Sequence, residues 1–324
     1  MKKTRGAGRV LIQAPEGLRS QALSLARLLE RRVGSSVYIS GNPCFGACNI
    51  ALKEAEALNA DLIIHLGHTE LVPNPELKVI YVEAKSNVDV LGVAEKSLPL
   101  MTKYERVGLI TTLQHVHKLD DVKGFLEKHG KVVHIGDVSG NLKYPGQVIG
   151  CDYTAAQTVK DAVEVFLFIG GGLFHPLGAA LKTGKPVITA DPFTGQARDL
   201  EEEVKKVLRQ RYAAIVKARE AKVYSVILGL EPGQMRLREG EVMVEKLRRQ
   251  GKDVFRISVN IVSPDILQSF EEVEVFINMA CPRLAVDGVQ ALGKVVLNPD
   301  EALIMLGENT WEAYVKEAYA TQGS

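Results

Sequence analysis

A unit of roughly one hundred residues recurs three times along this chain of 324 residues. Each copy begins with a short apolar run and a polar turn, continues into an amphipathic helical pattern, and then carries three more apolar runs. The opening apolar runs lie at Val10–Gln13, Val107–Thr111 and Tyr224–Leu228. Continuous apolar strands separated by helices are typical of parallel sheets that are covered on both faces. The repeat therefore predicts an α/β protein of three similar small parallel-sheet domains around a pseudo-threefold axis.

The repeat also predicts where the chain divides. A chain of 324 residues suits two or three domains of roughly 100–150 residues each. A long charged helical pattern from Asp199 to Lys222 joins the second and third copies. The predicted domains, each with one candidate ligand cysteine, are 1–103 (Cys48), 104–217 (Cys151) and 218–324 (Cys281).

Composition argues against several classes of protein. The formal net charge of +1 is unlike the basic excess of a protein that binds nucleic acid by neutralising phosphates. No run approaches the roughly 18 apolar residues that span a bilayer. The start, "MKKTRGAGRVLIQAPEG", has neither the apolar stretch nor the cleavage site of a signal peptide. We therefore expect a cytoplasmic protein with no membrane partner and no direct nucleic-acid partner.

Three of the four cysteines occupy comparable places in the three copies. Cys48 and Cys151 follow the second strand of their copies, and Cys281 follows the third strand of its copy. Ligands of open parallel sheets bind beyond the carboxyl ends of the strands. Three similar domains around one axis are thus able to bring these thiols together, whereas Cys44 is left over.

Three thiolates without a fourth ligand fit a metal site with one open coordination position. A structural zinc site usually carries paired C-x2-C knuckles, but Cys44 and Cys48 are spaced C-x3-C and the other two stand alone. Soft thiolates from distant segments favour iron–sulfur chemistry over hard metals. The usual radical S-adenosylmethionine loop, C-x3-C-x2-C, is not present, because Ala51 stands where its third cysteine would be. For any single cysteine, an inert place in the core is the alternative.

Segments along nearly the whole chain resemble a known family. They are "VLIQAPEGLR" (10–19), "GAC" (46–48), "IIHLGH" (63–68), "TTLQHVHKL" (111–119), "YPGQVIGCDY" (144–153), "FIGGGLFHPLG" (168–178), "ADPFT" (190–194), "GQMRL" (233–237) and "ACPR" (280–283). Together and in this order, these segments are highly specific. Through them the chain resembles the archaeal 2-(3-amino-3-carboxypropyl)histidine synthases, which begin diphthamide synthesis on elongation factor 2.

The resemblance implies a homodimer of three-domain protomers, each with a [4Fe-4S] cluster on Cys48, Cys151 and Cys281. It implies S-adenosylmethionine as co-substrate, cleaved at its Cγ–S bond so that methylthioadenosine leaves. The 3-amino-3-carboxypropyl radical then adds to C2 of a histidine of elongation factor 2, with an electron donor that the sequence does not identify. The resemblance does not require Cys44 as a ligand. We interpret Cys44 as a neighbour of the cluster, with replacement of Cys48 in ligation as the alternative.

Four polar residues near strand ends are candidates for binding S-adenosylmethionine. Arg283 is suited to bind the substrate carboxylate, with an ion pair to Asp287 as the alternative. Gln234 lies in the turn after the first strand of the third copy, where a hydrogen bond within the turn is the alternative. Gln13 and Glu16 occupy the equivalent turn of the first copy, and Glu16 is equally suited to the start of a helix.

The second copy offers a glycine-rich candidate. Gly170, Gly171 and Gly172 end a buried strand and allow backbone N–H groups to approach a ligand closely. The segment lacks the rest of a dinucleotide fingerprint, and we assign it to the adenosine or methionine part of S-adenosylmethionine. His175 follows as a ligand contact or, equally, as a structural histidine.

Two histidine pairs have the spacing of metal ligands. They are His65 with His68, and His115 with His117. Neither pair has an evident third partner in the sequence. We interpret all four as turn residues near the dimer interface or the surface that meets the protein substrate.

Two other functions compete with the transferase. A quinolinate-synthase-like enzyme also resembles three α/β units that share a cluster on three cysteines, with the open iron acting as a Lewis acid on a dicarboxylic substrate. The contexts "PGQVIGC" and "ACPR" favour the transferase. The other rival is a non-catalytic module with structural zinc or with cysteines packed in its core.

Overall fold

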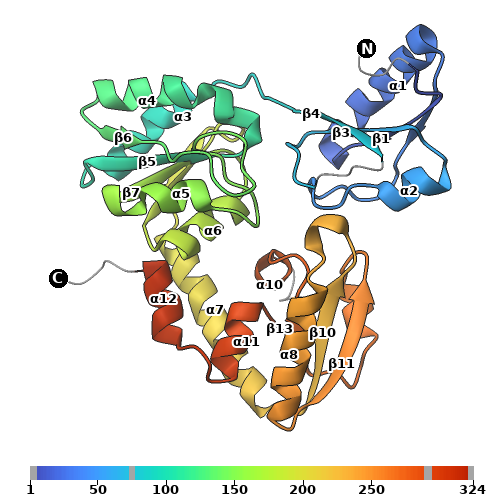
Figure 1. The fold of residues 1–324 in the computed structure, drawn as a ribbon. Coiled ribbons are helices and arrows are strands. Elements are labelled where there is room, and N and C mark those ends of the chain that lie inside the picture. Colours follow the sequence, from blue (N-terminus) through green and yellow to red (C-terminus); the bar gives the residue numbers. More distant parts are fainter. Residues whose placement is uncertain (1–5, 73–76, 288–293, 320–324) are drawn as a thin grey trace. The chain divides into compact units, whose positions relative to one another are not determined.

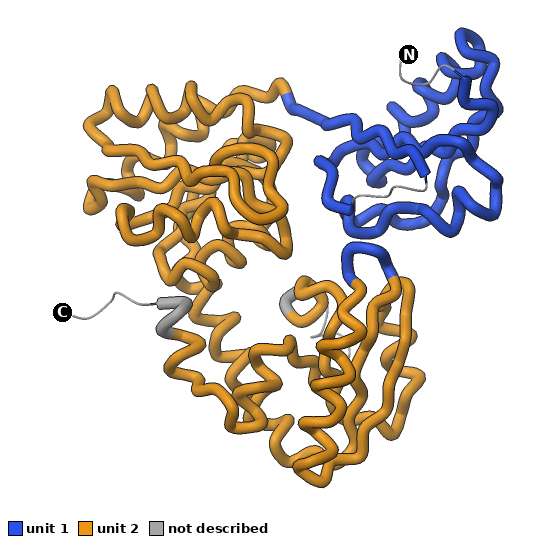
Figure 2. Tube along the Cα trace, viewed as in Figure 1, with its two compact units in different colours: residues 1–86, 231–234 blue, residues 87–230, 235–324 orange. Residues whose placement is uncertain are grey.

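The structure is a computed structural model that describes residues 6–72, 77–287 and 294–319. The chain forms two compact units (Figure 2). Unit 1 comprises residues 1–86 and 231–234, and unit 2 comprises residues 87–230 and 235–324. The described residues form three sheets, one in unit 1 and two in unit 2 (Figure 1).

Unit 1 is built on a four-stranded parallel sheet with the strand order β2-β1-β3-β4. Its elements are β1 (Arg9–Gln13), α1 (Arg19–Val33), β2 (Ser36–Ile39), α2 (Leu52–Ala57), β3 (Leu62–Leu66) and β4 (Lys78–Val82). Successive residues of β1 point to opposite faces of the sheet. Val10 and Ile12 pack with Leu29 of α1 on one face. Leu11 packs with Ala55 of α2 on the other face, so the apolar run of β1 is buried on both faces.

Unit 2 begins with a five-stranded sheet of order β6-β5-β7-β8-β9. Its elements are α3 (Leu91–Ser97), β5 (Arg106–Thr111), α4 (Leu119–Lys128), β6 (Val132–His134), α5 (Thr154–Val159), β7 (Val165–Ile169), α6 (Phe174–Thr183), β8 (Val187–Asp191) and β9 (Gln196–Asp199). Leu109 of β5 packs with Val122 of α4 in one core. Phe166 of β7 packs with Leu177 of α6 in the other.

The second sheet of unit 2 has four parallel strands in the order β11-β10-β12-β13. Its elements are β10 (Val223–Gly229), α8 (Leu237–Arg249), β11 (Asp253–Val259), α9 (Pro264–Gln268), β12 (Val275–Asn278), α10 (Leu284–Asp287), β13 (Val295–Leu297), α11 (Pro299–Met305) and α12 (Trp311–Tyr319). Tyr224 and Val226 of β10 pack with Val244 of α8. Ile227 faces a second cluster with Phe276 and Leu267.

Helix α7 (Glu201–Glu220) links the two sheets of unit 2. Val204, near its start, belongs to the core around Phe166, and Ile215, near its end, belongs to the core around Tyr224. The helix therefore confirms the charged helical pattern that the sequence predicts between Asp199 and Lys222.

The predicted strands all form, and their parallel pairing confirms the α/β class. Strand β9 is an addition that the repeat does not predict, and it pairs antiparallel with β8. Gly195, with φ of 66°, closes the turn between these strands by donating its N–H to the Asp191 carbonyl over 2.8 Å. Helix α3, which the repeat places in the first domain, contacts β8 and β9 of unit 2. The three domain boundaries and the pseudo-threefold axis stay predictions.

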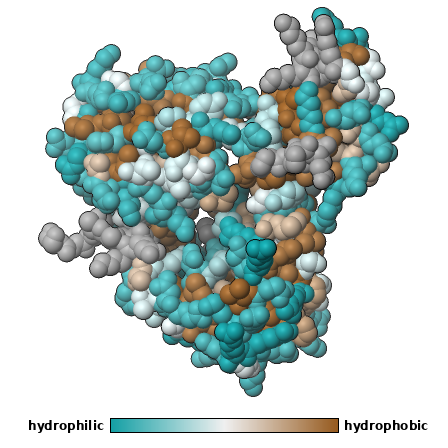
Figure 3. Space-filling model, in the orientation of Figure 1, coloured by the Kyte–Doolittle hydropathy of each residue, from teal (hydrophilic) through white to brown (hydrophobic). Residues whose placement is uncertain are grey.

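Polar and apolar residues are interspersed over the face drawn in Figure 3. In the described ranges, no helix has both the length and the apolar content that crossing a membrane requires. The longest of them, α7, has charged residues in both its first and its last turns.

Candidate functional site

The first cysteine loop runs from β2 to α2 in unit 1 and is fastened by two buried amide side chains. Asn49 donates from Nδ2 to the Pro43 carbonyl over 3.0 Å and accepts from the Phe45 N–H over 3.3 Å. Gln13, at the end of β1, donates from Nε2 to the Asn49 carbonyl over 2.7 Å and accepts from the Ala51 N–H over 3.1 Å. The end of a core strand therefore sets the position of the loop that carries Cys48.

Cys48 itself is half-buried in unit 1 and lies against residues 231–234. The Gly233 N–H donates to the Cys48 carbonyl over 2.8 Å, and Gln234 Nε2 lies 3.4 Å from Cys48 Sγ. A Cβ atom at position 233 would lie 2.6 Å from Cys48 Cα and 2.7 Å from Cys48 Cβ. Glycine is thus the residue that permits this close approach.

We expect the variant Gly233→Ala to be destabilised by about 1–3 kcal/mol, because the added methyl group overpacks the Cys48 backbone. Urea unfolding of the wild type and the variant measures the loss. Gly17→Ala is the matched control in unit 1, since no atom lies within 4 Å of the added Cβ there. An unchanged unfolding midpoint for Gly233→Ala would contradict the close packing.

The second cysteine loop runs from β6 to α5 in unit 2 and presents Cys151 to solvent. Buried Asp152 holds the loop: its Oδ2 accepts from the Asn141 N–H over 2.8 Å, and its Oδ1 accepts from the Thr154 N–H over 2.9 Å. A Cβ atom on Gly150 would lie 2.7 Å from the Phe174 ring, so this ring packs directly beside the residue that precedes Cys151. The thiol is therefore exposed on a backbone that is well fixed.

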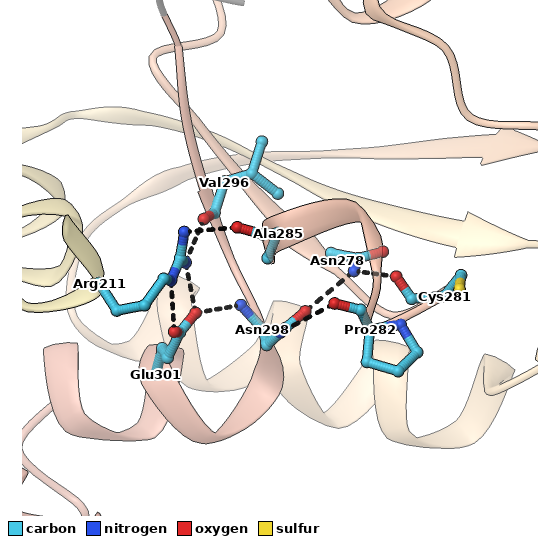
Figure 4. Close-up of polar contacts among 8 residues, drawn as sticks. All are labelled: Arg211, Asn278, Cys281, Pro282, Ala285, Val296, Asn298 and Glu301. Carbon is cyan, nitrogen blue, oxygen red and sulfur yellow. Dashed lines mark hydrogen bonds and ion pairs between the residues drawn. The ribbon is translucent and has the colours of Figure 1, made fainter. Parts of the chain in front are cut away.

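The third cysteine follows β12 and is held by two asparagines (Figure 4). Asn278 Nδ2 donates to the Cys281 carbonyl over 2.7 Å and to Asn298 Oδ1 over 3.0 Å. Asn298 Nδ2 donates to the Pro282 carbonyl over 3.3 Å. These bonds fasten the Cys281 turn to the N-terminus of α11.

A buried ion pair beside Asn298 supports this turn (Figure 4). Glu301 of α11 accepts from the Asn298 N–H over 2.7 Å. Both of its oxygens also accept from the Arg211 guanidinium of α7, over 2.6 and 2.5 Å. Arg211 donates further to the carbonyls of Ala285 and Val296, over 2.8 and 2.6 Å. With Arg211 7% and Glu301 1% exposed, the charges are satisfied inside the protein, as buried charges must be.

One aromatic ring lies next to both cysteine segments of unit 2. Phe174, at the start of α6, packs beside Gly150 on one side. The Arg283 guanidinium lies 4.6 Å from its ring centroid, a typical cation–π distance. Since Gly150 precedes Cys151 and Arg283 follows Cys281 by two residues, the Phe174 side chain brings the two loops to one place.

Comparison with known proteins places the chain in a family. Residues 14–315 match the family model described as "Putative diphthamide synthesis protein". The chain belongs to the diphthamide synthesis family. The match spans the loops of all three cysteines, Cys48, Cys151 and Cys281.

Relatives of known name are similar over most of their length. The 2-(3-amino-3-carboxypropyl)histidine synthase of Pyrococcus horikoshii is 39% identical over 303 residues, covering 93% of this chain and 86% of that protein. The synthase of the same name from Methanocaldococcus jannaschii is 31% identical over 315 residues, covering 92% and 84%. The crystal structure of Dph2 from Pyrococcus horikoshii with a 4Fe-4S cluster has a TM-score of 0.86 at 38% identity, over 94% of this chain and 88% of that chain.

In this diphthamide synthesis protein, the candidate residues for S-adenosylmethionine are spread over both units. Gln13 is 2% exposed, and Glu16 is exposed at the start of the 3-10 helix 16–18. Internal hydrogen bonds occupy the Gln13 amide, so its assignment to the cofactor stays a prediction that its burial does not favour. Arg283 is exposed beside Phe174, and the side chain of its alternative partner, Asp287, lies outside the described part of the structure.

The glycine segment 170–172 lies at the carboxyl end of β7. Gly170 is buried and donates its N–H to the Ala190 carbonyl over 3.0 Å, whereas Gly171 and Gly172 are exposed. His175 stacks on Phe168, with ring centroids 6.3 Å apart. Burial, with a smaller effect from Arg283, lowers the pKa of His175 to about 4, so the imidazole is neutral at pH 7.

The interpretation of the histidine pairs as surface turn residues is wrong for two of the four. His65 is fully buried in β3, and His115 is 1% exposed with an Nδ1 that has no hydrogen-bond partner in the structure. His117 is exposed in the 3-10 helix Leu113–Lys118, and its place near the dimer interface or the protein substrate stays a prediction. The pair of His65 and His68 also has a third partner, because Cys44 lies beside it. Burial of a strand-end histidine depends on what packs over it, and the pattern of spacing alone does not reveal that.

The residues that position the cysteine loops are not among those that the sequence patterns indicate. Those residues are Asn49, Asp152, Phe174, Arg211, Asn278, Asn298 and Glu301. One of them leaves a local signal, since "NPDE" at 298–301 has the spacing of a capping box with proline at the first helical position. Asn49, Asp152 and Asn278 bond to residues two to six positions away, within loops that have no regular pattern. Arg211 and Phe174 act through contacts between distant segments.

Proposed function

We propose that this protein binds a [4Fe-4S] cluster through Cys48, Cys151 and Cys281 and performs the first step of diphthamide synthesis. It would transfer the 3-amino-3-carboxypropyl group of S-adenosylmethionine to C2 of a histidine of elongation factor 2. The observation that carries the proposal is the Phe174 ring, which lies beside the segments of both Cys151 and Cys281. The family membership and the related synthases support the reaction.

The three cysteines suit a cluster in chemistry and in exposure. Cys151 is exposed, and Cys48 and Cys281 are half-buried, so a cluster has access to all three thiols. Cys44 differs, because burial and, to a smaller extent, Cys48 raise the pKa of its thiol to about 12. Iron–sulfur clusters are held by cysteine thiolates, and three of them leave one iron open. A cluster held by these three residues would supply the electron that breaks the Cγ–S bond of S-adenosylmethionine.

The remaining residues bind and orient the substrate. The Arg283 guanidinium, held over Phe174, binds the carboxylate of the 3-amino-3-carboxypropyl group. His175, neutral at pH 7, offers a lone pair to the substrate ammonium. Gln234 beside Cys48 and the exposed backbone of Gly171 and Gly172 are assigned to the rest of S-adenosylmethionine.

The partners of the reaction follow from the same proposal. Elongation factor 2 is the protein substrate, and the protein acts in the cytoplasm as a homodimer with a separate electron donor. Size-exclusion chromatography with light scattering measures the oligomeric state, and a monomer at micromolar concentration would contradict the dimer.

The deciding experiment incubates the anaerobically purified protein, reduced with dithionite, with S-adenosylmethionine and elongation factor 2. We expect methylthioadenosine to form and the mass of the factor to rise by one 3-amino-3-carboxypropyl group. Formation of 5′-deoxyadenosine, or no turnover by protein that carries its iron, would refute the proposed reaction.

We expect Arg283→Gln to raise the KM for S-adenosylmethionine roughly 10- to 100-fold, the effect of losing a charged hydrogen bond of about 1.5–3 kcal/mol. Initial rates of methylthioadenosine formation give the KM. Arg283→Lys should recover part of the affinity, because lysine keeps the charge but not the planar fork. Arg238→Gln, at an exposed position of α8, is the matched control. A KM that stays at the wild-type value in Arg283→Gln would remove Arg283 from the site.

A further inference from the structure

Three side chains with metal-binding atoms meet inside unit 1, apart from the three proposed cluster ligands. Cys44 lies in the loop after β2, and His65 is the penultimate residue of β3. His68 lies in the turn that follows β3. One ligand atom from each of the three lies within 4.8 Å of the other two. Cys44 is 7% exposed and His65 0%. Gly67, with φ of 97°, makes the turn that returns His68 to the side of His65.

The hydrogen bonds around His65 leave one of its nitrogens ready to accept a metal ion. Gln13 Oε1 is an acceptor, because it receives the Ala51 N–H over 3.1 Å. His65 Nδ1, 3.0 Å from the same oxygen, therefore donates its proton to it. The lone pair of His65 is then on Nε2, which faces His68 Nδ1 over 2.8 Å. Metal-bound histidines almost always donate their other N–H to a carbonyl or carboxylate oxygen in this way.

The protonation states of the histidines suit metal binding. Burial, with a smaller effect from His68, lowers the pKa of His65 to about 3, and burial lowers that of His68 to about 4. Both imidazoles are thus neutral at pH 7, which is the form that ligates a metal. The buried Cys44 is a neutral thiol that a bound metal ion would deprotonate.

We propose that Cys44, His65 and His68 form a zinc site that is separate from the iron–sulfur cluster. One thiolate and two imidazoles are a donor set that zinc binds, and a water molecule completes its four-fold coordination. Ferrous iron binds such ligands more weakly than zinc does. This inference goes beyond the proposed transferase and does not depend on it.

Binding requires only small movements and one exchange of a proton. Zinc distances of about 2.3 Å to sulfur and 2.0–2.1 Å to nitrogen place tetrahedral ligand atoms roughly 3.3–3.6 Å apart. The Cys44 sulfur therefore closes in on the nitrogens by up to about 1 Å from separations of at most 4.8 Å, whereas His65 Nε2 and His68 Nδ1, now 2.8 Å apart, separate by about 0.5 Å. The Cys44 thiol releases its proton to solvent as the S–Zn bond forms. The His68 proton moves from Nδ1 to Nε2, which leaves Nδ1 as the ligand.

The ion would tie the Cys48 loop to the sheet. Cys44 and Cys48 share the loop after β2, and His65 belongs to β3. Gln13 joins the two, since the same side chain bonds to His65 and to the Asn49 carbonyl. Zinc at this position fastens the start of the loop, while Asn49 fastens its end.

The first test is the metal content of the anaerobically purified, full-length protein after reconstitution with iron and sulfide and addition of zinc. We expect inductively coupled plasma mass spectrometry to find about one tightly held zinc ion per chain. Cys44→Ser and His68→Gln should lose at least nine tenths of this zinc, while Cys48→Ala should lose iron and keep zinc. His115→Gln, at another buried histidine of the chain, is the matched control and should keep both metals. Less than a tenth of a zinc ion on the wild type, or zinc that persists in Cys44→Ser, would overturn the proposal.

A second measurement does not depend on the folding of the Cys44 variants. Cobalt(II) is added to the full chain in which Cys48, Cys151 and Cys281 are replaced with alanine, so that Cys44 is the one remaining thiol. We expect a sulfur-to-cobalt charge-transfer band and the intense visible bands of tetrahedral cobalt, both displaced by one equivalent of zinc. A spectrum of octahedral aqueous cobalt alone would overturn the site. The iron content of the wild type tests the cluster separately, so the two proposals fail by different observations.

Discussion

Replacing Cys48, Cys151 or Cys281 with alanine is expected to remove the brown colour and the iron of the anaerobic protein and to abolish methylthioadenosine formation. The reason is that a cluster held by three thiolates has no protein ligand in reserve once one is lost. Iron analysis, the visible spectrum and the product assay on the same preparations measure the effect. We expect each of the three variants to have only background activity. The effect should be the same for Cys48 of unit 1 as for Cys151 and Cys281 of unit 2.

Cys44→Ala is the matched control for iron, because Cys44 is also a loop cysteine of unit 1 but is buried. It should keep the iron content of the wild type. Iron that disappears from Cys44→Ala but persists in Cys48→Ala would exchange the roles of these two residues. Full iron in all four single variants would refute the assignment of the cluster.

The second large effect is on stability. Glu301→Ala is expected to lower the free energy of unfolding by about 3–5 kcal/mol, because it leaves the Arg211 guanidinium buried without a counter-charge. The change also removes the capping bond to the Asn298 N–H. Denaturant unfolding followed by circular dichroism measures the loss. Because Asn298 fastens the Cys281 turn, the surviving folded protein should also bind less iron.

Two comparisons make this expectation specific. Glu201→Ala breaks an exposed ion pair with Lys205 and should change stability by no more than about 0.5 kcal/mol. The double variant Arg211→Met/Glu301→Leu should be less destabilised than the sum of its single changes, because no unpaired charge remains. A loss below about 1 kcal/mol in Glu301→Ala would contradict the role of the buried pair.

Much of the fold was predictable because the apolar runs carry it. A strand buried on both faces is apolar over most of its length, so "LIIHL" and "VFLFI" mark β3 and β7 without any knowledge of their neighbours. Strand β9, "QARD", is polar and short, and it forms only because the turn at Gly195 returns it to β8. A strand of this kind has no periodicity that a sequence pattern detects.

The candidate site likewise has features that the sequence predicts and features that it does not. The places of Cys48, Cys151 and Cys281 follow from the repeat, since each lies beyond a strand that the repeat predicts. Arg283 and Gln234 were candidates because they lie near such strand ends. The contact of Arg283 with Phe174 was not predictable, because it joins residues that are more than one hundred positions apart in the chain.

By itself, the sequence determined the α/β class, the strands, the linking helix α7 and the loops that carry the cysteines. These features depend on local patterns of apolar residues, which act over a few neighbouring positions. Only the tertiary structure decided that Arg211 is buried against Glu301 and that Cys44 lies with His65 and His68. Such contacts depend on how separate elements pack, and the free energy that selects them is shared among many residues far apart in the chain.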